Sequence, residues 1–440
     1  EDTNVGNESV DIQQQEPVEI SELETTENND LSKSSESITV DESIAEDILA
    51  TQADTAVVVG TVSDYLTAKG DAKLYNINLP AGVYLQAQLT TPANADLDYD
   101  LYLLDAEGNI LTGSDYYTYI NGTAGTLPEA LGYITSGDTA TYYLYVLASE
   151  GGSVSESFTL DYSVSTACDS YEIDESVRQA LAFTYGAGGA YIESRNLSSP
   201  IDNDWYVITV PSSRIYDKLK ISATTASTNT CSVEVYQNVA SEGYQMKRVG
   251  SGNTISVSSG KYYIRVSNAK TMENFDDLDI QNYKLSITPI LKATGIVITD
   301  LKGSEGLNKV VNYPGYGAHF RTQGSGTLTV YGVLTATDSS TGVTYAVGGE
   351  QINGLYYSPA WEANNTSANA IRRGTGTTDS SGKFEIDISL PPGIGVYSYY
   401  GSTSTHYFDI CGVSVSPSDD SSISASETIF HLAYTMYHPF

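Results

Sequence analysis

The residues that most often carry catalysis are few in this chain and are scattered along it. The four histidines form no i, i+4 pair and no HExxH motif, so nothing predicts a zinc hydrolase. They are His319, His406, His431 and His438. No GxSxG motif is present to raise a serine nucleophile, and Cys411 lies in the segment DICGVSV without a neighbouring base. The sequence therefore predicts that the protein is not an enzyme.

The three cysteines are too few and too scattered for a disulfide framework or a tetrahedral zinc site. Cys168 and Cys231 could pair within one domain, and the alternative is that all three thiols, with Cys411, are isolated in cores. We expect isolated thiols.

The charge balance limits the classes of partner. Lys and Arg total 21 residues against 55 Asp and Glu, which gives a formal net charge of −34. This charge repels the phosphate backbone of nucleic acids and anionic lipid headgroups, so neither is an expected partner. No stretch approaches the roughly 20 apolar residues that cross a bilayer, and membrane insertion is not expected. The first residues have neither a basic start nor an apolar core, so a signal peptide is either absent or already removed. We expect a secreted protein from which it has been removed.

The first 54 residues differ in composition from the rest of the chain. They contain sixteen acidic residues against Lys33 and no aromatic residue. Such a segment buries too little apolar surface to offset its chain entropy. We expect residues 1–54 to be a disordered acidic leader or spacer.

From about Thr55 the pattern becomes that of β-strands separated by turns. Apolar and polar residues alternate in KLYNINL (73–79), YLQAQL (84–89) and YYLYVL (142–147), as in half-buried strands. A second stretch repeats the order, since KLYNINLP matches DWYVITVP and YYLYVLAS matches YYIRVSNA at a spacing of roughly 120 residues. The sequence therefore predicts a duplicated β-sandwich, with one copy in residues 55–166 and one in 167–291.

Three short motifs in these repeats are similar to those of a known family. They are CDSYEIDESVRQA and NLSSPIDNDWYVITVP in the second repeat and DLDYDLYLLDAEGNIL in the first. Both repeats resemble the bacterial pre-peptidase C-terminal domain, the family that includes the collagen-binding domains of clostridial collagenases. The resemblance covers about Thr55 to Ile290 and implies a β-sandwich in each repeat.

The resemblance also implies a calcium site, because some members of the family bind calcium where the acidic segment folds against the following strand. Converging carboxylates supply the six to eight oxygens that calcium prefers. Carried over to the second repeat, the ligands are Glu172, Asp174, Glu175, Asp202 and Asp204. The first repeat has Lys73 at the position of the key Asp. Its own alternating acids, Asp96, Asp98 and Asp100, share one strand face, where we expect water rather than a metal to solvate them.

The last unit, residues 292–440, has a different strand pattern. Its central run GTTDSSGKFEIDISLPPGIGVYSYY resembles the immunoglobulin-like and transthyretin-like sandwiches of bacterial surface proteins. The expected fold is therefore all-β, with three β-sandwich domains in series after the acidic segment.

The excess of tyrosine is the best indication of a binding surface. The chain has 35 Tyr against 8 Phe and 2 Trp, and Tyr gives a large amphipathic contact area at low entropic cost. One candidate cluster is Tyr116, Tyr117 and Tyr119, which follow a turn. The other candidate set lies in the connection INGLYYSPAWEANN, of the kind that carries function, and is Tyr356, Tyr357 and Trp361.

These observations predict a secreted or cell-surface bacterial adhesion protein that binds a host protein, a matrix protein or a glycan without catalysis. Two alternatives stay open: a structural spacer of the cell envelope, and an accessory, non-catalytic region of a secreted hydrolase.

Overall fold

The computed structural model describes residues 36–37, 57–115, 127–166, 168–225, 231–240, 245–251, 253–268, 281–303, 326–364, 370–400 and 402–438. The described chain is almost entirely β-structure, which confirms the expected all-β fold class. Within these residues, helices are too short and too polar to cross a membrane. The acidic segment 1–54 lies almost wholly outside the described residues.

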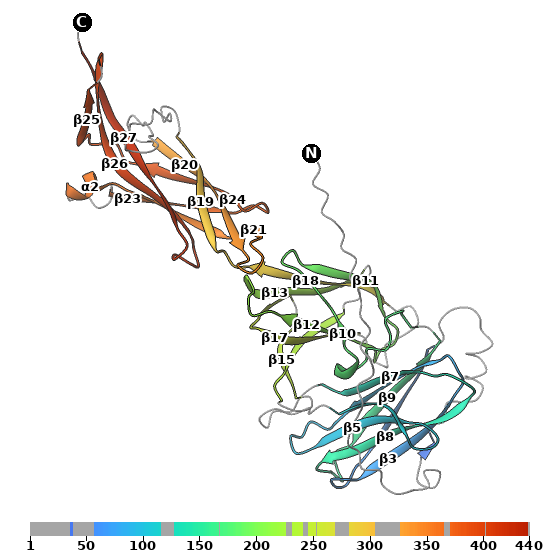
Figure 1. The fold of residues 1–440 in the computed structure, drawn as a ribbon. Helices are drawn as coiled ribbons and strands as arrows, with labels where there is room; N and C mark the ends of the chain where they lie inside the picture. The colour runs from blue at the N-terminus through green and yellow to red at the C-terminus, as the bar shows by residue number, and fades with distance from the viewer. Residues whose placement is uncertain are drawn as a thin grey trace. The chain divides into compact units, whose positions relative to one another are not determined.

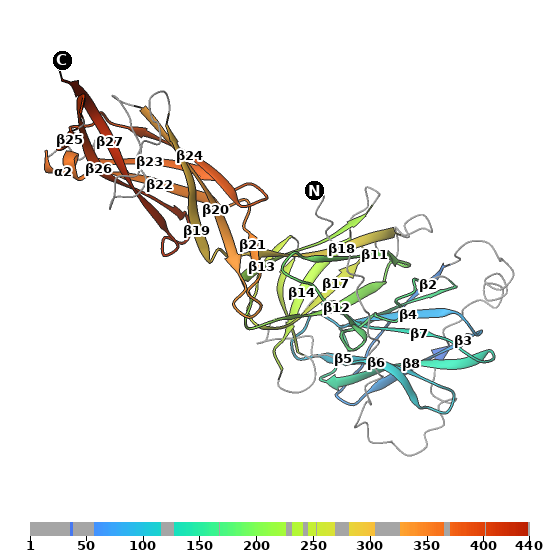
Figure 2. The same cartoon turned by 45° about the horizontal axis from the view of Figure 1, so that its top comes forward.

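The chain divides into two compact units (Figures 1 and 2). One unit holds the residues through Ser212 together with Lys218–Pro289, and so contains both repeats. The other unit holds Ser213–Asp217 and Ile290–Phe440. The two repeats therefore pack closely enough to form one body.

The first repeat is a sandwich of two sheets, ordered β1-β3-β8-β5-β6 and β2-β9-β4-β7. Its inward side chains, including Tyr99, Leu144 and Phe158, are completely buried between the sheets. The strands of the first sheet are β1 (Glu36–Ser37), β3 (Ala72–Leu79), β5 (Asp98–Leu104), β6 (Ile110–Ser114) and β8 (Ala140–Glu150). Those of the second sheet are β2 (Val57–Asp64), β4 (Tyr84–Thr90), β7 (Glu129–Ile134) and β9 (Phe158–Ser165).

The second repeat has the same strand order, with sheets β10-β12-β17-β14-β15 and β11-β18-β13-β16. The edge strands β1 and β10 even pair in the same sense, each parallel to its neighbour. The two repeats therefore have equivalent strand orders. The strands are β10 (Leu181–Ala182), β11 (Ala190–Leu197), β12 (Asn203–Val210), β13 (Tyr216–Thr225), β14 (Ser232–Asn238), β15 (Met246–Ser251), β16 (Thr254–Ser256), β17 (Gly260–Ser267) and β18 (Gln281–Leu291).

The C-terminal unit also has two sheets. One has the order β19-β20-β21 with β24 beside β20, and the other β23-β22-β26-β25 with β27 beside β26. Buried and exposed residues alternate without exception along β24, KFEIDISL, as its sequence period requires. The elements are β19 (Gly295–Gly303), β20 (Gly326–Thr337), β21 (Thr344–Ala346), β22 (Gln351–Tyr357), α2 (Pro359–Ala363), β23 (Ile371–Thr377), β24 (Lys383–Leu390), β25 (Tyr397–Tyr400), β26 (Ser404–Pro417) and β27 (Ala425–Tyr437).

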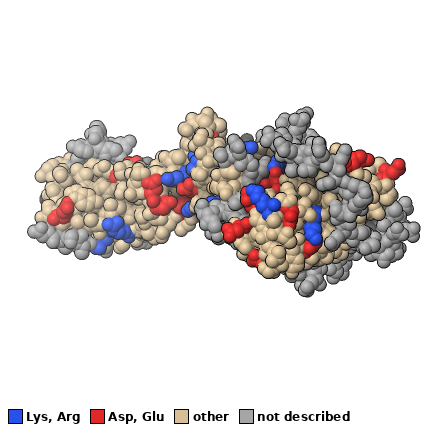
Figure 3. Space-filling view, turned by 90° about the horizontal axis from the view of Figure 1, so that it is seen from below, with Lys and Arg blue, Asp and Glu red and all other residues tan. Residues whose placement is uncertain are grey.

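Acidic and basic side chains are interspersed on the face of the molecule drawn in Figure 3. Most of the described surface in that view belongs to residues that carry no formal charge. The acids with the most unusual surroundings are instead buried, at the beginning of the second repeat.

Candidate metal centre

The acidic segment that begins the second repeat folds back on the first residues of β12. The backbone N–H of Trp205 donates to the carbonyl oxygen of Asp174 (3.0 Å), which ties the segment to the strand. This contact brings together all five residues that the family resemblance implied. Except for the half-buried Glu172, their side chains are buried; the five are Glu172, Asp174, Glu175, Asp202 and Asp204.

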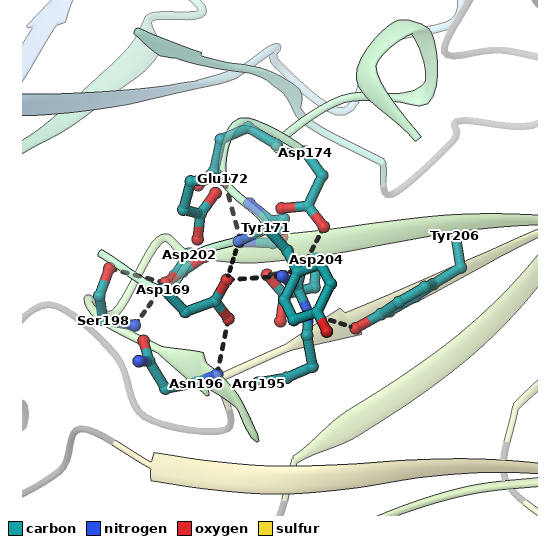
Figure 4. Close-up of polar contacts among 12 residues, drawn as sticks. Asp169, Tyr171, Glu172, Asp174, Arg195, Asn196, Ser198, Asp202, Asp204 and Tyr206 are labelled. Atoms are coloured by element: carbon teal, nitrogen blue, oxygen red, sulfur yellow. Dashed lines mark hydrogen bonds and ion pairs between the residues drawn. The ribbon is translucent and has the colours of Figure 1, made fainter. Parts of the chain in front are cut away.

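A buried arginine that the sequence analysis did not single out lies at the centre of this cluster (Figure 4). The guanidinium of Arg195, from β11, is completely buried and pairs with Asp169 (2.6 Å), Asp204 (2.9 Å) and Asp174. Its Nε donates to the hydroxyl of Tyr206 (2.7 Å). Two of the five implied metal ligands therefore already have an internal cation.

The first repeat contains the same ion pair with its charges exchanged. Lys73 on β3 is at the position of Asp204 on β12, as their cross-strand partners show. Asp64 on β2 is likewise at the position of Arg195 on β11. Asp64 and Lys73 are 2.7 Å apart and partly exposed. Where the resemblance to the pre-peptidase C-terminal domain implies a key acid, the first repeat thus has Lys73, and Lys73 pairs with Asp64.

The remaining three acids form a second group. Ligand oxygens of Glu172, Glu175 and Asp202 lie within 4.8 Å of one another. Among the described residues, no Lys or Arg forms an ion pair with any of the three, although the charge of Arg195 partly offsets the rise that burial causes in the pKa of Glu172 and of Asp202. Neutral groups contact them instead: the Tyr84 hydroxyl lies within hydrogen-bond distance of Glu172 (2.7 Å) and Glu175 (2.5 Å), and the hydroxyl of Ser198 donates to Asp202 (2.8 Å).

Burial makes the charged forms of these carboxyl groups unfavourable. Desolvation, together with the nearby charge of Asp202, raises the pKa of Glu172 to about 8. The same causes raise the pKa of Glu175 well above its ordinary value, and desolvation raises the pKa of Asp202. Three carboxylates so close together in a low-dielectric site need either protons or a cation.

The donor set fits calcium. Three buried oxygen atoms at this group have no hydrogen-bond partner among the described residues: Glu172 Oε1, Asp202 Oδ1 and Gln86 Oε1. Carboxylate and amide oxygens are the ligands that Ca²⁺ prefers. A second trio, Asp169, Glu172 and Asp204, is equally close, but Arg195 already pairs with two of its members. The group of Glu172, Glu175 and Asp202 is therefore the candidate metal centre, where a bound cation would neutralise the carboxylates.

The acids of the first repeat differ from the expectation of hydrated side chains. Asp96 is exposed, but Asp98 and Asp100 on β5 are almost fully buried, close to the completely buried Glu129. Asp98, Asp100, Asp115 and Glu129 lie close to one another in the first repeat. Burial and the charge of Asp98 raise the pKa of Asp100 to about 7, and burial raises the pKa of Glu129 well above its ordinary value. The expectation of simple hydration is wrong for Asp98 and Asp100, because every residue of β5 is buried from bulk water.

The tyrosine candidates have different outcomes. Tyr116, Tyr117 and Tyr119 lie outside the described residues. Tyr356 is completely buried in β22, where its hydroxyl contacts Cys411 Sγ (3.1 Å) and His431 Nδ1 (2.9 Å). The proposal that Tyr356 is a surface contact is therefore wrong.

Its two neighbours in sequence are partly exposed and engaged locally. The Tyr357 hydroxyl donates to Glu362, and the Trp361 indole N–H donates to the carbonyl of Pro392 (2.8 Å). INGLYYSPAWEANN is thus a central strand followed by the short helix α2 rather than one long connection. All three cysteines are free, and burial raises the pKa of the Cys411 thiol to about 11.

A different aromatic surface is exposed on β25, β26 and β27. The strand register places Tyr400, Tyr407, Tyr434 and Met436 on one side of the sheet, and we call this group the aromatic face. Tyr400 is 71% exposed, Tyr434 46% and Met436 53%. The rings of Tyr407 and Tyr434 are stacked, with centroids 4.4 Å apart and an interplanar angle of 18°. This face was not predicted from the sequence, because its tyrosines lie in strands, whereas the predicted contact residues lie in segments that resemble loops.

Comparisons with known proteins give no family for this chain. No family model matches it. A 74-residue stretch is 36% identical to the uncharacterized protein YlqB of Bacillus subtilis (strain 168), a match that covers 17% of this chain and 46% of that protein. The chain thus spans about half the length of the curated relative it matches.

Similar solved structures are distant. They include the periplasmic inhibitor of g-type lysozyme PliG from Aeromonas hydrophila (11% identity, TM-score 0.16, 26% of this chain and 88% of that one). They also include the CUB1-EGF-CUB2 region of human MASP-1/3 (11%, 0.16, 52% and 99%) and the tandem CBM22 domains of Paenibacillus barcinonensis Xyn10C (11%, 0.15, 53% and 91%). TM-scores this low carry no argument about function.

Proposed function

We propose that this chain is a non-catalytic extracellular binding protein whose C-terminal sandwich binds a neutral glycan at the aromatic face. Its second repeat is stabilised by calcium held by Glu172, Glu175 and Asp202. The observation that carries the binding function is the exposure of stacked tyrosine rings on a sheet, because exposed apolar groups gathered in one place mark interaction sites.

The chemistry of the aromatic face favours a sugar over a charged ligand. Flat, stacked rings match the apolar C–H face of a pyranose, and tyrosine hydroxyls can bond to its rim. The cross-strand neighbours of the rings, Ser398 and Thr405, are uncharged. The acid on β26, Asp409, is buried and accepts backbone N–H groups of Ile394 (2.6 Å), Gly395 (2.8 Å) and Val396 (2.9 Å).

Glycan-array screening of the full chain, followed by titration of the best glycan, tests the proposal. We expect the double variant Tyr400→Ala, Tyr434→Ala to lose at least about 10-fold in affinity, because truncating aromatic contact residues commonly removes more than 1 kcal/mol. Tyr65→Ala is the matched control, since Tyr65 is 42% exposed but lies in the first repeat. Equal binding by the double variant and the wild type would overturn the proposal, as would a chain that captures an extracellular protein but no glycan.

A further inference from the structure

The candidate metal centre lies against the first repeat as well as the second. Tyr84 and Gln86 belong to β4 of the first repeat, and both are buried. The Tyr84 hydroxyl contacts Glu172 and Glu175, and the Gln86 amide N–H donates to Glu175 (2.6 Å). Burial raises the pKa of Asp202 overall, and the Gln86 amide partly offsets this rise. Two of the three acids of the centre, Glu172 and Glu175, therefore bond directly to the other repeat.

Close packing continues beyond these two residues. A methyl group added at Gly132, on β7, would lie only 2.6 Å from Glu175 Cγ and 2.8 Å from Ile173 Cγ2. Arg178 of the second repeat forms a bidentate ion pair with Asp115 of the first, at 2.5 and 2.7 Å from its Nη2. The acidic segment at the beginning of the second repeat (residues 168–180) is thus held between β7 of the first repeat and β12 of the second.

Gln86 gives an independent indication of a ligand. Its amide nitrogen is bonded, but within the part of the chain that the structure describes its oxygen, Oε1, has no hydrogen-bond partner, although the side chain is only 1% exposed. An unpaired buried amide oxygen costs free energy, and a cation between the three carboxylates would relieve that cost. Gln86, a neutral residue of the first repeat, therefore has an oxygen with no described hydrogen-bond partner at the same place as the acids of the second repeat.

We propose that the metal centre is a joint between the repeats, so that the first repeat completes the site and a bound cation locks the two sandwiches together. The inference rests on the proposed calcium site in the second repeat. Cation binding stabilises the arrangement that holds the ligands, and here that arrangement includes β4 and β7 of the first repeat. Removal of the cation then loosens both repeats at their contact.

The test uses the full chain, with calcium titration by calorimetry and hydrogen exchange measured with and without excess calcium. We expect calcium to slow hydrogen exchange in the acidic segment of the second repeat (residues 168–180) and also in β4 and β7 of the first repeat. Gln86→Met should weaken calcium binding by about 10- to 100-fold, the usual effect of removing a residue that holds metal ligands in place. It should also abolish the calcium effect in β4 and β7.

Gln88→Met is the matched control, because Gln88 is on the same strand and also contacts the second repeat, through Asn203 (3.3 Å), without reaching the three acids. It should bind calcium like the wild type. Tyr84→Phe, which removes only the hydroxyl, replaces Gln86→Met if that variant does not fold. Glu175→Gln should abolish binding.

The outcomes separate the two proposals. If the wild type binds no calcium, both the site and the joint are wrong. If the wild type binds calcium but exchange in β4 and β7 is unchanged, or the Gln86 variant binds equally well, the joint is wrong and the calcium site stands.

Discussion

Replacing Arg195 with Met should destabilise the unit that contains both repeats far more than the loss of one surface charge would. Arg195 is completely buried and pairs with three carboxylates. Methionine fills a similar length of space but leaves Asp169, Asp174 and Asp204 without their cation. Their negative charges would then lie together in a site from which water is largely excluded.

Removing one partner of a buried ion pair costs about 3–5 kcal/mol, mainly because the remaining charge is left uncompensated. For a folding unit of 150–250 residues, each kcal/mol lowers the melting temperature by about 2–4 °C. Arg195→Met should therefore melt about 6–20 °C below the wild type. The deficit should shrink as the pH falls, because burial raises the pKa of Asp174 and of Asp204, and protonation can then neutralise these two carboxylates.

Differential scanning calorimetry of the full chain, with chelator present throughout, measures the effect without a contribution from bound calcium. Arg248→Met is the control: Arg248 belongs to the same repeat and pairs with Glu234 (3.1 Å), but its side chain is 46% exposed. Exposed pairs contribute about 0–1 kcal/mol, so this variant should melt within a few degrees of the wild type. If Arg195→Met and Arg248→Met have the same melting temperature, Arg195 does not stabilise the protein through its buried ion pairs.

Two further predictions concern the first repeat. The pKa of Asp100 is raised in the folded state, so its contribution to stability is complete below about pH 4 and is lost as the pH rises towards 7. Asp100→Asn should therefore reduce the pH dependence of the free energy of unfolding by up to about 1.4 kcal/mol per pH unit, measured by urea unfolding with chelator. An unchanged pH dependence would contradict the assignment. Leu127→Ala should lower the free energy of unfolding by about 2–5 kcal/mol, because Leu127 of the first repeat is buried beside Trp205 of the second. Calorimetry should show both repeats melting in one transition at a lower temperature, whereas the control Val154→Ala, at a 76% exposed site, should change the melting temperature little. A lowered transition for one repeat alone would argue against the shared core.

The acids of the candidate metal centre were named from the family resemblance, but the arginine that pairs with the neighbouring Asp174 and Asp204 could not be predicted from the sequence. On β11, Ile192, Arg195 and Leu197 are all buried, although strict alternation from Ile192 would turn Arg195 outward. A bulge between Ile192 and Arg195 changes the alternation. Bulges leave no clear mark in a single sequence, so the reversal is visible only in the folded chain. The contribution of Gln86 is equally hidden, because it depends on how the two repeats pack.

The position of Tyr356 illustrates the opposite error. Gly354 and Asn353 make the segment look like a loop, yet β22 pairs with β23 on one side and β26 on the other. Glycine is needed there because a Cβ at Gly354 would lie 2.9 Å from a methyl group of Ile386 on the facing sheet. Tyr356 then points into the core by the ordinary alternation of a strand. A residue typical of turns was present for close packing between sheets.

The exchanged ion pairs of the two repeats have a consequence for how a duplicated chain folds correctly. Tandem domains of similar sequence are prone to trade equivalent strands during folding. A hybrid in which β2 replaced β11 would bring Asp64 beside Asp204, and the reciprocal hybrid would bring Arg195 beside Lys73. Each wrong combination brings two like charges together, whereas each correct one joins opposite charges. The reversal of sign thus favours the pairing of each strand within its own sandwich.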